Sequence, residues 1–179
     1  TYIIISQAGY LIMGIISGSP AGITAIIFGL IVFMLNSLGL LFCTDQISKK
    51  YNINEIDGLK GLGKNDKLLF LSFFYFLISS AGFPLSAGFT GKILLYLSLG
   101  STSYFMLIAI GILSSVVFLY FIFKLTLVLF SGKNVQKTAK TETLSLIILL
   151  ILLIPNILLG FYFEPVLNWA RYCTNLIGI

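Results

Sequence analysis

The stretch SSAGFPLSAGFTGK, residues 79–92, lies in the middle of one of the most apolar parts of the chain. The preceding residues, 68–78, read LLFLSFFYFLI, and the following residues, 93–99, read ILLYLSL. A continuous helix through all 32 residues from 68 to 99 would be about 48 Å long. Because the hydrocarbon core of a bilayer is only about 30 Å thick, one straight span does not fit this run.

A break in the helix fits the run better, and the quoted stretch contains the residues that make one. Pro84 lacks a backbone N–H donor and clashes with the preceding turn. Gly82, Gly88 and Gly91 loosen the helix on both sides of the proline. The sequence therefore predicts a short non-helical segment that joins two half-helices, at roughly 68–82 and 88–99.

The composition of the chain is that of a membrane protein. Of its 179 residues, 58% are hydrophobic and 9% are charged, whereas a soluble domain has roughly 25% charged residues. The formal net charge is +5, but the lysines lie between apolar runs rather than on one basic face, so we expect no nucleic-acid partner. Cys43 and Cys173 lack metal or disulfide spacing, and the chain contains no histidine. We therefore expect that the chain has no metal site and that lipids surround it.

Apolar runs alternate with polar loops along the chain. This pattern predicts one all-α membrane domain, residues 1–179, with about five transmembrane helices. The third of these helices is the one broken near residues 83–88. The predicted spans are residues 2–17, 21–43, 68–99, 103–130 and 144–163.

The distribution of charge predicts the orientation. Five spans place both long loops on one side of the membrane, and these loops hold eight lysines, whereas the other side has only Arg171. We therefore expect the N-terminus and the lysine-rich loops on the inner side, and a short C-terminal tail with Trp169 and Tyr172 as interfacial anchors on the outer side. The loop lysines are Lys49, Lys50, Lys60, Lys64, Lys67, Lys133, Lys137 and Lys140.

The backbone groups that a helix break sets free cannot face lipid, because each would cost several kcal/mol. We expect the break to be buried in protein or to line a wet cavity. Broken helices of this kind occur at the ion sites of transporters. The side chains expected to bond to some of the freed groups are Ser79, Ser80, Ser86 and Thr90.

Two lysines, Lys92 and Lys124, lie within apolar runs. A lysine at the bilayer centre costs about 2.5 to 3.5 kcal/mol on insertion scales, so its presence points to a function. Burial disfavours the charged form of an amine, which lets a buried lysine carry protons. The alternative is snorkelling, in which the long side chain reaches the membrane surface. For Lys124, six residues from the inner end of its run, both interpretations stay open.

The acidic residues all lie outside the apolar runs, and Glu164 comes just after the last run. A buried lysine that relays protons needs a carboxylate or another relay group nearby. We therefore expect a neighbouring chain to supply that group, so that this protein works as a subunit. The six acids are Asp45, Glu55, Asp57, Asp66, Glu142 and Glu164.

Other polar residues inside the runs could bind water along a proton path. The alternative for each is a hydrogen bond between packed helices, which is common in membrane bundles. These residues are Gln7, Tyr10, Asn36, Ser37, Ser114, Ser115 and Tyr120.

Four stretches resemble the antiporter-like membrane subunits of respiratory complex I, in the order found in that family. ISQAGY (5–10) resembles an SSISxxGY segment, and IDGLKGLGKNDKLL (56–69) resembles a DLKGLG loop. LISSAGFPLSAGFTGKILLY (77–96) resembles an LSLAGIPPLAGFxGKFYLF segment of the subunit 2 (NADH dehydrogenase subunit 2) group, and SSVVFLYFIFKLTLVLF (114–130) resembles the segment after it. The likeness is to the C-terminal half of that subunit and covers most of residues 1–130.

The resemblance implies a share in proton translocation coupled to NADH:ubiquinone oxidoreduction, as a subunit of that reductase. It implies that Lys92 is the lysine at the break of a discontinuous helix on a hydrophilic axis, and that Lys124 is the basic residue of the next helix. We expect no cofactor in this chain, because NADH, FMN, iron–sulfur clusters and ubiquinone would bind to other subunits. The implied partners are other complex I membrane subunits, including a separate chain with the N-terminal half of subunit 2.

The implied location is the mitochondrial inner membrane, with the N-terminus and lysine-rich loops on the matrix side and the C-terminus on the intermembrane side. Two departures stand out: Pro84-Leu85 replaces the paired prolines of the family, and Gln7 stands where subunit 2 often has histidine. Two other functions stay open at this point. One is a structural membrane scaffold without its own proton path, and the other is part of a cation/proton antiporter.

Overall fold

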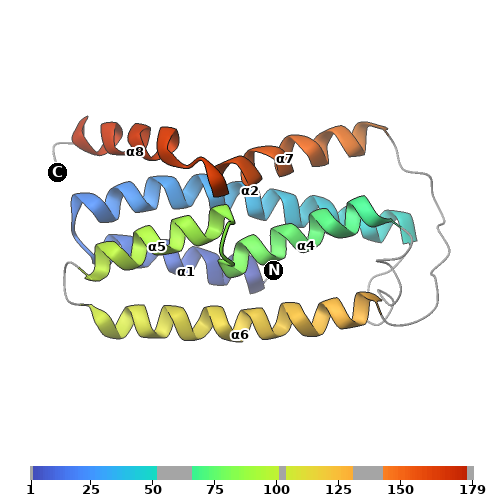
Figure 1. The fold of residues 1–179 in the computed structure, drawn as a ribbon, viewed down its shortest axis with the longest axis horizontal. Coiled ribbons are helices and arrows are strands. Elements are labelled where there is room, and N and C mark those ends of the chain that lie inside the picture. The colour runs from blue at the N-terminus through green and yellow to red at the C-terminus, as the bar shows by residue number, and fades with distance from the viewer. Residues whose placement is uncertain (1, 52–65, 101–103, 131–142, 177–179) are drawn as a thin grey trace.

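The computed structural model describes residues 2–51, 66–100, 104–130 and 143–176. These residues form seven α-helices that run alongside one another in a single elongated bundle (Figure 1). The predicted all-α membrane bundle with an interrupted third run is confirmed. The helices are α1 (Tyr2–Ile16), α2 (Pro20–Tyr51), α4 (Lys67–Ala81), α5 (Ala87–Gly100), α6 (Phe105–Phe130), α7 (Thr143–Phe161) and α8 (Glu164–Leu176).

Three of the described helices, α2, α6 and α7, are long and apolar enough to cross a membrane. α1 and α4 are shorter apolar helices. A lipid-exposed backbone must satisfy its hydrogen bonds within its own segment, and long runs of Leu, Ile and Phe in helical form do so. The exposed apolar side chains along α6, such as Ile110, Leu113 and Phe121, are therefore expected for a helix at the edge of a membrane bundle.

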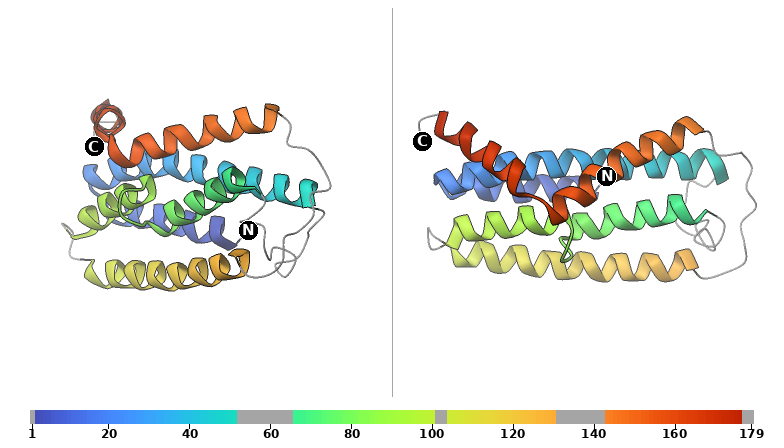
Figure 2. Two further views of the ribbon diagram at one scale, coloured as in Figure 1. Left: turned by 45° about the vertical axis from the view of Figure 1, so that its right-hand side comes forward. Right: turned by 45° about the horizontal axis from the view of Figure 1, so that its top comes forward.

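α2 is the central helix, and it contacts α1, α4, α5, α7 and α8. In Figures 1 and 2, α7 and α8 lie along one side of the bundle and α6 lies along the other. α1, α2, α4 and α5 lie between them. The expectation that the whole break is buried was wrong for its middle, because Phe83, Pro84 and Leu85 are exposed. The polar residues beside it are buried, namely Ser79, Ser80, Ser86 and Lys92.

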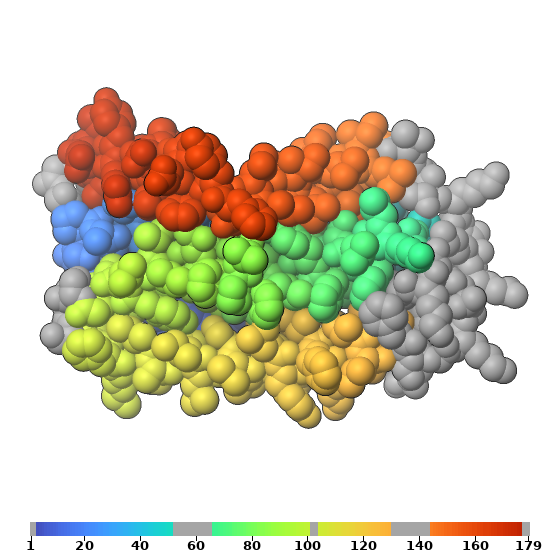
Figure 3. Space-filling view, in the orientation of Figure 1, coloured from blue at the N-terminus to red at the C-terminus, as the bar shows by residue number. Residues whose placement is uncertain are grey.

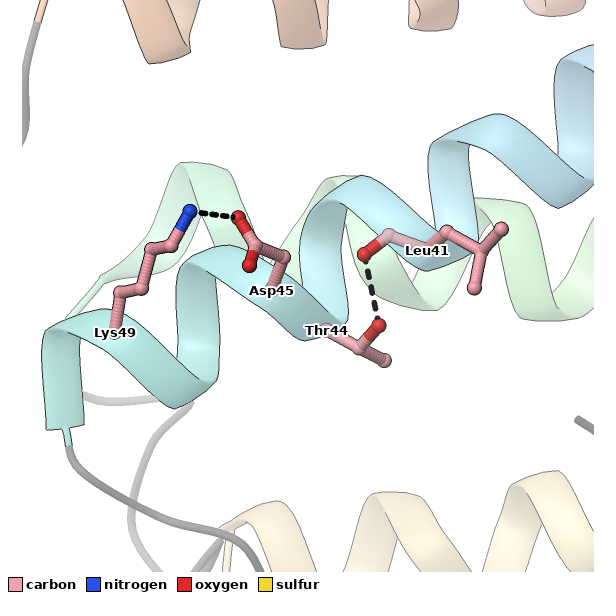
Figure 4. Close-up of polar contacts among 4 residues, drawn as sticks. All are labelled: Leu41, Thr44, Asp45 and Lys49. Carbon is pink, nitrogen blue, oxygen red and sulfur yellow. Dashed lines mark hydrogen bonds and ion pairs between the residues drawn. The ribbon is translucent and has the colours of Figure 1, made fainter.

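α2 continues as a helix past Cys43, the end of the predicted apolar span, to Tyr51. Its last turns carry an ion pair between Lys49 and Asp45 at 2.7 Å, and the Thr44 hydroxyl donates to the Leu41 carbonyl oxygen at 2.8 Å (Figure 4). Lysines near a helix C-terminus also interact favourably with the helix dipole. These contacts stabilise a polar extension of an apolar helix. A further ion pair joins Lys50 at its end to Asp66 just before α4.

The C-terminal tail, for which no secondary structure was predicted, forms the helix α8. α8 lies against α2, with Leu167, Ala170 and Thr174 buried. Trp169 and Tyr172 are exposed. α7 and α8 follow one another along the same side of the bundle, so together they form a second interrupted pair of helices (Figure 1).

Several predicted features lie outside the described residues, and the structure leaves them as predictions. They are most of the loop that contains GLKGLG, the lysines Lys60, Lys64, Lys133, Lys137 and Lys140, and the acids Glu55, Asp57 and Glu142.

Candidate functional site

The candidate site is built around the break between α4 and α5. α4 ends at Gly82, whose φ of 80° is left-handed and suits glycine. The Gly82 N–H donates to the Ser79 carbonyl oxygen at 3.0 Å, and the Phe83 N–H donates to the Ile78 carbonyl oxygen at 3.2 Å. These bonds close the end of α4 in the manner of a helix C-cap, so the break has a defined geometry.

α5 begins after a serine cap. The Ser86 hydroxyl donates to the Phe83 carbonyl oxygen at 2.6 Å and accepts the Phe89 N–H at 3.4 Å. Leu85 has a φ of 70°, which is strained for a leucine. Proline fixes φ near −65° and could not adopt this conformation. This form of the break therefore requires that residue 85 is not a proline.

Lys92 extends from α5 back toward the break rather than toward the membrane surface. Its ammonium donates to the Ala81 carbonyl oxygen at 2.9 Å and to the Ser115 hydroxyl at 3.1 Å. The Nζ atom also lies 4.2 Å from the centre of the Tyr10 ring, in cation–π geometry. The residue is 7% exposed. Because the carbonyl end of a helix carries partial negative charge, the end of α4 offsets part of the lysine's charge.

Tyr10 and Gln7 of α1 hold the other side of this site. The Tyr10 hydroxyl donates to the Gly111 carbonyl oxygen at 2.8 Å and bonds to the hydroxyls of Ser114 and Ser115. The Gln7 amide donates to the Ser80 carbonyl oxygen at 2.6 Å. The lysine site is thus formed by four elements, α1, α4, α5 and α6, that are distant in sequence.

A second polar cluster lies on the other side of the break and includes a residue that the sequence analysis missed. Asn156 of α7 is 0% exposed, and its amide donates to the Asn36 side-chain oxygen at 2.7 Å. The Ser79 hydroxyl donates to the Asn156 oxygen at 3.2 Å and accepts the Gly88 N–H at 3.3 Å. Asn156 stands in the apolar run 144–163, as Asn36 does in 21–43, so the same rule of costly buried amides could have identified it.

A small cavity of about 30 Å³ lies between the two clusters. Because a water molecule needs at least about 10 to 15 Å³ of such space, this cavity is large enough for water. A larger hollow of about 570 Å³ lies between α1 and α6 and also reaches Lys92. Both spaces are lined by Gln7, Tyr10 and Lys92. Asn36 lines the small cavity but not the larger hollow.

The remaining candidate residues are placed less centrally. Tyr120 and Lys124 are exposed on α6, and Lys124 has no hydrogen bond or ion pair with the described part of the chain. Thr90 is half-buried. The Ser80 hydroxyl is fully buried and has no hydrogen-bond partner among the described residues, which suits a water contact.

Charged partners and metal ligands are sparse around the break. In the described ranges, the ion pairs are those of Lys49 with Asp45 and of Lys50 with Asp66, so no described carboxylate pairs with Lys92. The same ranges hold no group of three or more His, Cys, Asp or Glu side chains that could bind a metal ion. The site therefore combines one buried cation with neutral hydrogen-bonding groups.

Residues 1–118 match the family described as NADH:quinone oxidoreductase/Mrp antiporter, transmembrane. The chain belongs to this family. It is 32% identical over 183 residues to NADH-quinone oxidoreductase subunit N 2 of Chloroherpeton thalassium, which covers 99% of the chain and 36% of that protein. It is 33% identical over 120 residues to NAD(P)H-quinone oxidoreductase subunit 2 of a Synechococcus species, which covers 67% of the chain and 23% of that protein.

The fold is also similar to that of a chain in the solved structure of the Mrp complex from a Dietzia species. The TM-score is 0.83 at 21% sequence identity, and the match covers 95% of this chain and 40% of that one. The chain thus spans little more than a third of the length of the relatives that it matches over nearly its whole length.

Proposed function

We propose that this chain is the C-terminal half of subunit 2 (subunit N) of a complex I, and that it takes part in proton translocation coupled to NADH:quinone oxidoreduction. Relatives at 30–33% identity carry the names of that subunit. The likeness to the Mrp structure, at 21% identity, supports the fold only. The observation that carries the proposal is the Lys92 ammonium, held at a helix break between the Ala81 carbonyl, the Ser115 hydroxyl and the Tyr10 ring.

In this proposal Lys92 accepts a proton and passes it to water. The ammonium has hydrogen-bond partners that persist when the proton leaves, because a carbonyl oxygen and a hydroxyl do not depend on its charge. Water in the small cavity would connect the amine to Asn36, and the larger hollow between α1 and α6 would let a group of a neighbouring chain approach it. A carboxylate from another subunit at that hollow would complete the relay.

The proposed partners are the other membrane subunits of the complex. NADH, FMN, iron–sulfur clusters and ubiquinone would bind in other subunits. The mitochondrial inner membrane, with the lysine-rich loops facing the matrix, stays the predicted location. The chain's relatives include bacterial and chloroplast proteins.

The test compares Lys92→Met with Lys92→Arg in the assembled complex, reconstituted into vesicles. Arginine keeps the positive charge but does not release its proton, so it separates a relay from a structural cation. We expect both variants to assemble. In both, coupled NADH oxidation and vesicle acidification should fall about tenfold, which corresponds to an increase of about 1.4 kcal/mol in the activation free energy. Normal acidification per NADH oxidised in Lys92→Arg would refute the relay role.

A cation/proton antiporter is the second candidate, because the description of the family that residues 1–118 match includes the Mrp antiporter. Purification of the chain with its native partners separates the two functions. Copurification with flavin and iron–sulfur subunits supports the first proposal, and their absence supports the second. A scaffold without a proton path would leave acidification unchanged in both lysine variants.

A further inference from the structure

Glu164 lies at an unexpected depth in the bundle. The packing of α7 against the break places it: a Cβ atom at Gly160 would lie 2.7 Å from the Leu85 carbonyl oxygen, and Leu159 packs with Ala87. α8 begins at Glu164, four residues after Gly160. The junction of α7 and α8 and the break between α4 and α5 therefore lie at the same level along the bundle, as Figure 1 shows.

The other end of α8 gives the same depth independently. Thr174 bonds to Thr24 at 3.0 Å, near the beginning of α2 at Pro20. Glu164 lies ten residues before Thr174, which is about 15 Å along the helix toward the middle of the bundle. If the Thr24–Thr174 contact is taken as the level of one edge of the hydrocarbon core, half of whose thickness is also about 15 Å, this carboxylate is placed near the membrane centre.

The Glu164 side chain is exposed on the lateral surface and has no hydrogen bond or ion pair with the described residues. Leu158 near the end of α7 and Tyr162 just after it are exposed as well, and a notch separates α7 from α8 in the space-filling view (Figure 3). A carboxylate in contact with lipid at this depth is strongly disfavoured, so intramembrane acids almost always pair with a partner. Pro165 also removes one free N–H donor from the first turn of α8.

α8 has three distinct faces. Leu167, Ala170 and Thr174 face the bundle. Trp169, Tyr172 and Leu176 form an exposed and largely aromatic stripe, which suits lipid. A third face, here called the polar stripe, is exposed and consists of residues at spacings of four, three and four, which place them on one side of a helix. The polar stripe comprises Glu164, Asn168, Arg171 and Asn175.

We propose that the polar stripe is an interface for a transmembrane helix of another polypeptide, one that places a lysine or arginine opposite Glu164. Charge complementarity at the membrane centre identifies this occupant, because only a cationic or strongly donating group compensates an intramembrane carboxylate. Asn168 and Asn175 hydrogen-bond to the same helix nearer the outer end. The inference rests on the proposed membership of a multisubunit complex, but it does not depend on proton transport by Lys92.

The first test measures assembly of the complex by native gel electrophoresis of solubilised membranes. Glu164→Lys places a lysine opposite the partner's cation, and we expect it to lower the amount of assembled complex at least tenfold. Glu164→Asp keeps the negative charge and should retain most of the assembled complex. Asn175→Lys is the matched control, because it adds the same charge to the same stripe at the outer end of α8. Assembly of Glu164→Lys at the level of Asn175→Lys would overturn the proposal.

The second test identifies the partner with a photoreactive phenylalanine analogue placed at Asn168 or at the adjacent Trp169. We expect the probe at 168 to cross-link to a membrane-spanning peptide that contains a lysine or arginine, and the probe at 169 to label lipid. Replacing that cation with glutamate should restore assembly of Glu164→Lys to at least half of the normal amount. Lipid adducts alone at position 168, or no rescue by the exchanged charges, would contradict the interface. Neither readout measures proton pumping, so failure here is distinct from failure of the Lys92 relay.

Discussion

The hydrogen-bonded amides of Asn36 and Asn156 are expected to hold α2 and α7 together beside the break. Asn156→Leu removes its bonds to Asn36 and Ser79, which are 2.7 and 3.2 Å long. Interhelical hydrogen bonds in membrane proteins contribute about 0.6 kcal/mol on average and up to about 1.7 kcal/mol. Two lost bonds, with buried partners left unpaired, therefore predict a loss of about 1 to 2 kcal/mol in the free energy of unfolding.

The double variant Asn36→Leu/Asn156→Leu sharpens this prediction. Each single variant leaves a buried amide without its partner, whereas the double variant replaces both by apolar side chains. We therefore expect the double variant to lose less stability than the sum of the singles, by about 0.6 to 1.7 kcal/mol. Additive losses would mean that the two amides do not interact in the membrane.

A buried thiol gives the assay. Cys43 on α2 is 0% exposed, so a maleimide reaches it only when the bundle opens. With Cys173 replaced by alanine, labelling of Cys43 is followed by mass spectrometry as membranes are titrated with a denaturing detergent. The midpoint of labelling should fall in the order normal chain, Asn36→Leu, Asn156→Leu. An unchanged midpoint in Asn156→Leu would refute the buried network.

Three other perturbations test the site. Gly88→Ala is expected to lower the free energy of unfolding by at least about 1 to 3 kcal/mol, because the new Cβ would overlap the Ser79 carbonyl oxygen. Its control is Gly9→Ala, whose Cβ would have open space around it, and this variant should be neutral or stabilising in the same thiol assay. Tyr10→Phe keeps the ring beside the buried amine but removes the hydroxyl bonds, so vesicle acidification should fall while assembly is retained, and unchanged acidification would show that the hydroxyl is dispensable. Lys124→Met should leave protons moved per NADH unchanged, because this side chain is exposed outside the cluster, and a lower ratio would make it a second relay.

The break itself could be predicted from sequence because its cause is local. Pro84 removes a donor wherever it stands, and Gly82 permits the left-handed conformation that it adopts, with φ of 80°. The proximity of Lys92 to the break followed from sequence spacing. Its contacts with Tyr10 and Ser115 did not, because they depend on how α1 and α6 pack against α5.

The ends of the helices could not be read from the apolar runs. Hydropathy marks where a helix leaves lipid, not where it stops, so the run that ends at Cys43 did not predict the continuation of α2 through Asp45 and Lys49. α8 was missed because its apolar residues are spaced for one helix face and do not form a run. The depth of Glu164 followed only from tertiary packing, of Gly160 against the break and of Thr174 against Thr24.

The close approach of Gly88 to Ser79 has a consequence for movement. The two half-helices meet backbone to backbone, with a capped end on each side and an amide bridge to α2 and α7. Such a joint is stiff, unlike a hinge that swings on the microsecond to millisecond scale of collective helix motions. We therefore expect proton transfer to involve rotation of the Lys92 side chain and reorientation of nearby water, while the helices around it keep their positions.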